Sequence, residues 1–385
     1  MEFDLLSNGR KVIWIGNEHL QIAVAEGGGH IAALHCRGMP ETANPFWVPH
    51  WPSLEPSEVT DQIVEDHYGG APEGRLLASI LGHSLALDLY GAPSKEEAEA
   101  GAVTHGRVGV LPWKWELSGA AGLYGECEDS FAQLLFSRNL VVKGSCALIE
   151  ERVKNLCAWD RPIAWQQHVS LGSRFCEDGF WSQSNCDLGA THPQSFGPGA
   201  ELVPGSESRW PFSPRRSGGS FDYRVSLEAN RVANDFTGFR VSPSSDLGSF
   251  VAGNKRFHFA IFYIWPRQFF PWMGIWDEKH ARVLNPWEKR TSVRAYEFGV
   301  SPFPESRLDM LRRPSLLGLP TYLYLPGGRT LWVRYMLGAF APVHEAGELE
   351  ISDDTAKLIS DGREIGLVEL AGECASSERK EMRQV

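Results

Sequence analysis

The sequence lacks the short motifs that mark several common kinds of active site. Its 385 residues contain no Gly-Lys-Ser/Thr phosphate loop, no HExxH zinc motif and no GxSxG nucleophile elbow. The stretches SFGPGA and LPGG do not lie between a strand and a helix, so they are turns and not a dinucleotide fingerprint. We therefore expect neither a metal ion nor another cofactor.

Disulfide bonds and membrane-spanning segments are not indicated either. The seven cysteines are odd in number and form no CxxC pair, which is typical of reduced thiols. There is no run of about 18 apolar residues and no signal-peptide pattern. The formal net charge of −11 argues against nucleic acid, which needs a basic surface. We expect a cytoplasmic protein, monomer or homodimer, that binds a small molecule and contacts neither nucleic acid nor membrane.

Amphipathic helical patterns are scarce. In the best one, SKEEAEAG, Ser94 can cap the start, Glu97 can complete a capping box and Gly101 can end the helix. The stretch LDMLRRPSL predicts one or two further helical turns. The chain is therefore expected to have only a few short helices.

Strand patterns, in contrast, recur along the whole chain. KVIWIGN, LQIAVAE and HIAALHC follow one another near the N-terminus, and IAWQQHVSLG, RFHFAIFYIW, RAYEFGV and TLWVRYMLGAF come later. LVVKGSCALIEERVKNL predicts two strands joined across Lys143-Gly144. This spacing indicates an all-β fold, a large antiparallel β-sandwich. We expect a single domain over residues 1–370 and a polar tail over 371–385. The Ser-, Gly- and Pro-rich part from Gln183 to Arg216 is predicted to be a long surface excursion.

One predicted strand, RPIAWQQHVSLG, has an unusually polar centre. Strand alternation puts Trp165 and Gln167 on one face, and Gln166 and His168 on the other. A pocket that used residues of both sets would need a β-bulge in this strand. His168 and Gln166 are therefore the first candidates for a cleft, with Trp165 and Gln167 ranked below them.

Three other positions carry ionisable groups in suggestive surroundings. His83 follows Gly82, and His105 precedes Gly106; each could line a cleft, or be a loop histidine bonded to a carbonyl oxygen. Glu297 lies between aromatic residues in YEFG, where burial would raise its pKa toward that of a general base. The alternative is a surface Glu297 paired with a nearby arginine.

The order of these motifs resembles that of the aldose 1-epimerase (galactose mutarotase) family. The similar elements are EGGGHIAAL, THGRVG followed by Trp113, RPIAWQQHVSLG and YEFG, and the resemblance spans about residues 8 to 350. It implies a β-supersandwich that binds a free sugar in an open cleft. The family's Asn-Arg pair is absent near Gly82-His83, Val169-Ser170 replaces Tyr-Phe, and Arg107 replaces a glycine. These departures suggest a substrate other than plain galactose.

The resemblance also implies roles for particular residues. Glu297 would be the general base and His168 the general acid of a ring opening at the anomeric carbon, with His105 as a third catalytic residue. Tryptophan faces suit the C–H side of a pyranose, and the sequence has 14 tryptophans, of which more than half are expected to fill the core. The predicted substrate-binding residues are His83, Trp47, Gln166, Gln167, Trp165, Trp272, Trp276 and Glu278.

Other functions on the same fold stay open at this point. The protein could be a non-catalytic carbohydrate-binding protein, or an epimerase of a modified sugar. It could also be a lyase-like enzyme, for which Glu278, Asp277 and Tyr296 would be candidate acids or bases. A structural subunit with a Trp-rich, protein-binding surface is a further alternative.

Overall fold

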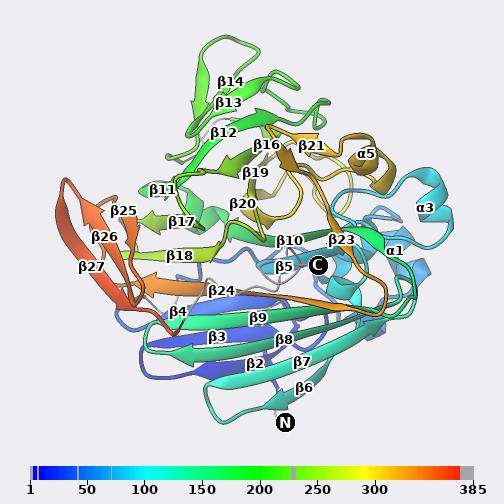
Figure 1. The fold of residues 1–385 in the computed structure, drawn as a ribbon, viewed down its shortest axis with the longest axis horizontal. Coiled ribbons are helices and arrows are strands. Elements are labelled where there is room, and N and C mark those ends of the chain that lie inside the picture. Colours follow the sequence, from blue (N-terminus) through cyan, green and yellow to red (C-terminus); the bar gives the residue numbers. More distant parts are fainter. Residues whose placement is uncertain (1–2, 7, 41–42, 71, 227–230, 373–385) are drawn as a thin grey trace.

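The computed structural model describes residues 3–372 except 7, 41–42, 71 and 227–230. Two large antiparallel sheets dominate it (Figure 1). The fourteen-stranded sheet contains, in spatial order, β1 (Asp4–Leu5), β2 (Lys11–Gly16), β3 (Leu20–Ala25), β4 (Ile31–Cys36), β5 (His83–Asp88), β10 (Arg161–Gly172), β20 (Ser292–Gly299), β19 (Trp272–Lys279), β16 (Ala233–Val241), β12 (Cys186–Thr191), β13 (Glu207–Arg209), β14 (Phe212–Pro214) and β15 (Ser220–Asp222), with β23 (Leu323–Leu325) paired to β10.

The second large sheet has eight strands. In spatial order they are β11 (Phe180–Ser184), β17 (Leu247–Asn254), β18 (Phe259–Pro266), β24 (Thr330–Phe340), β9 (Cys146–Asn155), β8 (Leu134–Lys143), β7 (Gly122–Asp129) and β6 (Lys114–Leu117). Two small sheets are formed by β21 (Ser315–Leu316) with β22 (Leu319–Pro320), and by β25 (Glu348–Ile351), β26 (Thr355–Ser360) and β27 (Arg363–Glu369). The predicted all-β supersandwich is confirmed.

The main core fills the space between the two large sheets. Alternate residues of each strand point into it, such as Trp165 and Val169 from β10 and Phe298 from β20. The facing sheet contributes Phe136 and Tyr335 among others. Because side chains alternate along a strand, the residues between these core positions point to the outer face of the fourteen-stranded sheet.

A second apolar cluster covers that outer face. Ala86, Ala164 and Ala295 supply it from β5, β10 and β20, and their small side chains leave depth above the sheet. The segment that includes η1 (Pro56–Glu58), α1 (Asp61–His67) and α2 (Gly74–Ser79) closes over them with Trp51 and Leu77. The central strands are thus buried on both faces, and a site can form between this cover and the sheet.

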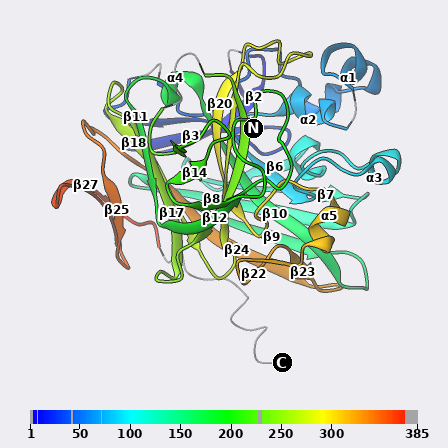
Figure 2. The same ribbon diagram turned by 90° about the horizontal axis from the view of Figure 1, so that it is seen from above.

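The short elements lie at opposite ends of the molecule. Figures 1 and 2 both place α1, α3 (Lys95–Glu99) and α5 (Arg307–Arg312) at one end and the sheet of β25–β27 at the other. The remaining short helices are α4 (Ser173–Cys176) and η2 (Val108–Val110). In the part of the chain that the structure describes, none of the helices is long and apolar enough to cross a membrane.

Local sequence signals were accurate where they concerned caps and turns. Ser94 accepts a hydrogen bond from the Glu97 backbone, the Glu97 side chain accepts one from Ser94, and α3 ends just before Gly101, which has a φ of +101°. The hairpin predicted at Lys143-Gly144 joins β8 to β9.

The prediction of one long excursion from Gln183 to Arg216 was wrong in part. β12, β13 and β14 lie within that range and extend the large sheet. β13 and β14 have only three residues each, too short to show an alternating pattern, and the six residues of β12, CDLGAT, do not alternate between apolar and polar either, so sequence periodicity could not reveal these strands. The expected single domain stays a prediction, and residues 373–385 of the predicted tail lie outside the described residues.

Candidate active site

Two ionisable side chains meet at the centre of the fourteen-stranded sheet. His168 on β10 and Glu297 on β20 are directly opposite each other in the antiparallel register. His168 Nε2 lies 3.2 Å from Glu297 Oε1, and the side chains are only 4% and 2% exposed. Facing residues of an antiparallel pair project from the same side of the sheet, so the backbone alone brings the two together.

These side chains form part of the lining of a cavity of about 620 Å³. Its other walls come from the α1–α2 segment, the loops after β5 and α3, β16, and the connection between β19 and β20. The lining residues are Tyr68, Gly69, Pro72, Glu73, Leu76, Leu77, Ile80, Gly91, Ala92, Thr104, His105, His168, Phe196, Pro198, Asn234, Phe236, Trp276, Arg282, Val283, Leu284, Asn285, Trp287, Glu297 and Pro304.

Burial pushes both members of the pair toward their uncharged forms. It raises the pKa of Glu297 to about 8, against a partial opposing effect of the hydrogen bond from Tyr90. It lowers the pKa of His168 to about 4. The protonated carboxyl with neutral imidazole, and the carboxylate with imidazolium, have the same total charge. The pair can therefore move one proton between its members without changing the net charge of the cavity.

Tyr90, which the sequence interpretation missed, holds the carboxyl group of Glu297. Its hydroxyl donates to Glu297 Oε2 over 2.6 Å. The contact depends on Gly274, which faces Glu297 from β19, because a Cβ at that position would lie 3.1 Å from the tyrosine hydroxyl and 2.3 Å from Phe236 Cζ. No local pattern in LDLYG signals this role, since the partner is distant in sequence.

A hydrogen bond at the second ring nitrogen of His168 holds its imidazole in place. Ser170, two residues along the same face of β10, has its Oγ 3.0 Å from His168 Nδ1. Gln166, on the same face in the other direction, exchanges two 2.9 Å hydrogen bonds with the backbone of Ser301. Gln166 was predicted to contact substrate, but it does not line the cavity and instead ties β10 to the chain just after β20.

His105 stands beside His168, in the loop after α3. The two ring centroids are 4.9 Å apart, and His105 has a left-handed backbone with a φ of +65°. Burial, with a smaller contribution from His168, holds the pKa of His105 well below its ordinary value. Among the described residues, its buried Nδ1 has no hydrogen-bond partner. The structure thus brings together the three residues predicted to be catalytic.

Tryptophan and asparagine side chains form one wall. Trp276, a predicted binding residue, lines the cavity and donates from Nε1 to Asn234 Oδ1 over 3.3 Å. Trp287, Asn234 and Phe236 line it as well and were not predicted. Trp287 belonged to a stretch rich in tryptophan, which was the available signal; Asn234 and Phe236 gave none.

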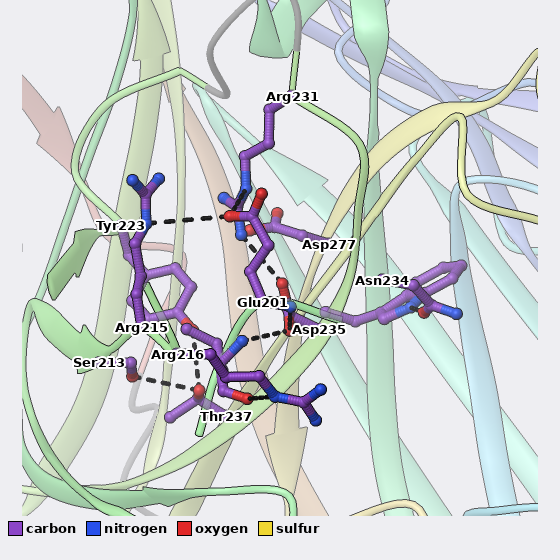
Figure 3. Close-up of polar contacts among 12 residues, drawn as sticks. Glu201, Ser213, Arg215, Arg216, Tyr223, Arg231, Asn234, Asp235, Thr237 and Asp277 are labelled. Atoms are coloured by element: carbon purple, nitrogen blue, oxygen red, sulfur yellow. Dashed lines mark hydrogen bonds and ion pairs between the residues drawn. The ribbon is translucent and has the colours of Figure 1, made fainter. Parts of the chain in front are cut away.

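Asp235, near the start of β16, anchors the wall that carries Phe196 and Pro198. Asp235 Oδ1 accepts hydrogen bonds from the backbone of Glu201 and Leu202, at 2.9 and 3.0 Å. Its other oxygen accepts from Arg231, over 2.9 Å. Figure 3 shows Glu201, Arg231 and Asp235 gathered on one side of β16, with Asn234 pointing away from them. Alternation along β16 thus separates an anchoring face from the cavity face.

Three predicted binding residues lie in the core, on the other face of the sheet. Trp165 and Gln167 donate to Glu151 Oε2 over 3.0 and 2.6 Å. His83 lies between Gln167 and Tyr263, at 3.0 Å from each. β10 has no bulge in its register with β5 and β20, so regular alternation keeps these side chains away from the cavity.

Three more of the predicted binding residues do not line the cavity. Trp47 stacks on Trp287 at 6.1 Å between ring centroids and supports it from behind. Trp272 donates to the backbone oxygen of Pro320, and Glu278 accepts from the backbone of the loop that follows β19. Each is buried by packing that the sequence pattern of aromatic and acidic residues could not distinguish from a binding wall.

Neither a family model nor a curated protein matches this chain in sequence. Solved structures do match its fold. One is a proposed aldose 1-epimerase from Klebsiella pneumoniae, with 12% identity, a TM-score of 0.59, and 86% of this chain and 79% of that one covered. A protein from Escherichia coli with the same description has 13% identity, a TM-score of 0.57, and 86% and 99% covered. A galactose mutarotase related enzyme from Lactobacillus acidophilus has 10% identity, a TM-score of 0.55, and 87% and 99% covered.

These matches confirm the resemblance at the level of the fold. The chain has the galactose mutarotase-like fold, and the identities of 10–13% establish nothing finer. Among the described residues, no group of three or more His, Cys, Asp or Glu side chains could hold a metal ion. The chemistry of the site must be argued from its own side chains.

Proposed function

We propose that this protein interconverts the anomers of a free sugar, as an aldose 1-epimerase does. The observation that carries the proposal is the 3.2 Å contact between His168 Nε2 and Glu297 Oε1 in a cavity that can admit a small molecule. Ring opening needs one group that takes a proton and one that gives a proton. A buried carboxyl–imidazole pair that shares a proton supplies both.

Glu297, as carboxylate, takes the proton from the anomeric hydroxyl, and His168, as imidazolium, donates its proton to the ring oxygen. The C1–O5 bond breaks and C1 becomes an aldehyde carbon. Rotation about C1–C2 presents the opposite face of the aldehyde. The same proton transfers then run in reverse and close the ring as the other anomer. His105, whose ring lies beside that of His168 and lines the cavity, can hold a sugar oxygen during the open-chain stage.

The Glu297–His168 pair should give a pH profile of kcat/KM that is flat between two limits. With pKa values of about 8 for Glu297 and about 4 for His168, the two groups together hold one proton between those limits. Only that singly protonated form contains the tautomer with a carboxylate base and an imidazolium acid. We expect kcat/KM to be constant between about pH 4 and pH 8, and to fall on both sides.

Exchange NMR on the purified protein tests the proposal. Magnetisation is transferred between the α and β anomeric protons of each member of a panel of common and modified aldoses, with and without protein. An enzyme raises the exchange rate in proportion to its concentration. A protein that gives saturation-transfer signals from a sugar without raising the rate is a non-catalytic carbohydrate binder, and this result contradicts the proposal.

A further inference from the structure

The lining of the cavity changes in character from its floor to its mouth. The polar groups His168 and Glu297 on the sheet, and His105 beside them, are buried. The cover over the sheet contributes Leu76 and Leu77 from α2. The connection between β19 and β20 adds Val283 and Leu284. A ligand would find polar partners at these buried groups and aliphatic surface at the leucines and Val283, beside the aromatic wall that includes Trp276 and Trp287.

Val283 and Leu284 are unusual because they are exposed as well as aliphatic. They are 54% and 75% exposed, although Leu76 and Leu77 of the same lining are buried. Single exposed apolar residues are common and need no explanation. Two consecutive ones in the lining of a cavity that also contains the candidate catalytic pair add an exposed aliphatic surface to that cavity.

The charged groups of the wall are already paired. Arg282 donates to Glu73, another lining residue, over 2.6 Å and lies 3.6 Å from Glu278. Its guanidinium also lies over the Trp287 ring, 4.6 Å from the centroid. Because Glu73 and Glu278 already balance the charge of Arg282, the wall offers an anionic substituent little uncompensated positive charge and favours an uncharged one.

We propose that the site takes a reducing sugar that carries an aliphatic substituent on a carbon other than C1. This inference rests on the proposed function, because ring opening requires a free hydroxyl at C1. The cavity of about 620 Å³ is in the range of ~300–1,000 Å³ that holds drug-sized ligands, which are larger than one pyranose. The sugar ring occupies the floor beside His168 and Glu297, and the substituent lies along Leu76, Leu77 and Leu284.

The test compares parent sugars with their alkyl ethers. Binding of D-glucose, D-galactose and their 3-O-hexyl and 6-O-hexyl ethers is measured by saturation-transfer NMR titration, and exchange NMR measures anomer interconversion of each. At least one ether should bind tighter than its parent by about tenfold or more, because each buried methylene contributes about fourfold. The inference is overturned if every ether binds no tighter than its parent, or if nothing binds.

The two proposals fail differently. If an ether binds tightly but no sugar is interconverted, the proposed function fails and the inference about the ligand stands. If the parent sugars are interconverted and the ethers show no advantage in binding or kcat/KM, the inference fails and the proposed function stands.

A pair of matched variants locates the substituent. Leu284→Ser should lower the ether-to-parent affinity ratio by about threefold or more, since part of the aliphatic contact is lost. Leu5→Ser, at a leucine that is 71% exposed on β1, removes a similar exposed side chain away from the cavity and should leave the ratio unchanged. An unchanged ratio in Leu284→Ser, or an equal fall in both variants, would contradict the placement.

Discussion

Each face of strand β10 lies beside a histidine and a glutamate, but the two sets have different roles. On the cavity face, His168 contacts Glu297 beside a cavity of about 620 Å³. On the core face, Gln167 contacts both His83 and Glu151 in a closed network. Burial lowers the pKa of both histidines, that of His83 well below its ordinary value. A buried histidine with a lowered pKa is therefore not by itself a mark of a site.

The glutamates on the two faces differ in the number of hydrogen bonds that their carboxylates accept and in the free volume beside them. The carboxylate of Glu151 accepts four hydrogen bonds, from Arg138, Trp165, Gln167 and Tyr335. That of Glu297 accepts one from Tyr90 and faces His168, with room for a ligand. A fully satisfied network rigidifies a core, whereas a pair beside open volume can exchange protons with a bound molecule.

Removing the ionisable group on the cavity face should have the largest effect. Glu297→Gln keeps the size and the polar contacts of the side chain but cannot act as a base. We expect the rate of anomer interconversion to fall by about 10²–10⁴-fold, the usual contribution of a positioned acid or base. Exchange NMR gives the rate, and saturation transfer should show that sugar binding persists.

The matching change on the core face should act on stability. Glu151→Gln removes the charge that pairs with Arg138, whose side chain is 1% exposed, and leaves that guanidinium buried. We expect the free energy of unfolding to fall by about 3–5 kcal/mol. Urea unfolding measures this loss, and the anomer exchange rate per folded molecule should stay within about tenfold of the wild type. A rate loss as large as that of Glu297→Gln would show that the core face is also needed for catalysis, and would contradict the comparison.

Much of the fold was predictable because its signals are local. The capping box at Ser94, the hairpin at Lys143-Gly144 and the alternation in β10 each depend on residues close in sequence. Alternation even assigned Gln166 and His168 to one face and Trp165 and Gln167 to the other. What it could not give is which face meets the core, because both faces of β10 are buried.

Site residues could be predicted from the sequence only where they belong to a recognisable motif. The catalytic roles of His105, His168 and Glu297 came from a resemblance in motif order, and the structure places all three on one cavity. Tyr90 could not be found, since its contact with Glu297 joins positions 207 residues apart. Trp47 and Trp272 were misassigned because tryptophan suits both a core and a sugar-binding wall.

A pH-dependent stability difference sharpens the comparison further. The pKa of Glu297 is about 8 in the folded protein, against 4.5 for an ordinary glutamate. Between these values the folded state retains a proton that the unfolded state has released, so stability falls as pH rises. The free energy of unfolding of the wild type, minus that of Glu297→Gln, should fall by about 1.4 kcal/mol per pH unit between about pH 5 and 8.

Below pH 4.5 and above pH 8 this difference should be constant, because both states then hold, or have both lost, the proton. Urea titrations at a series of pH values supply the measurement. A difference that is flat from pH 5 to 8 would mean that Glu297 has an ordinary pKa. In that case Glu297 and His168 would not share a proton over this range.

The smallest expected effect concerns the hydrogen bond from Tyr90, which favours the ionised form of Glu297. Tyr90→Phe removes that bond and leaves burial unopposed, so the pKa of Glu297 should rise further. The alkaline limb of the pH profile of kcat/KM should then move to higher pH, while the acidic limb, set by His168, stays in place. A limb that moves to lower pH, or both limbs moving together, would show that Tyr90 does not act through the Glu297 carboxyl group. Tyr263→Phe is the control on the core face, because its hydroxyl contacts His83 and not the catalytic pair, and it should leave both limbs where they are.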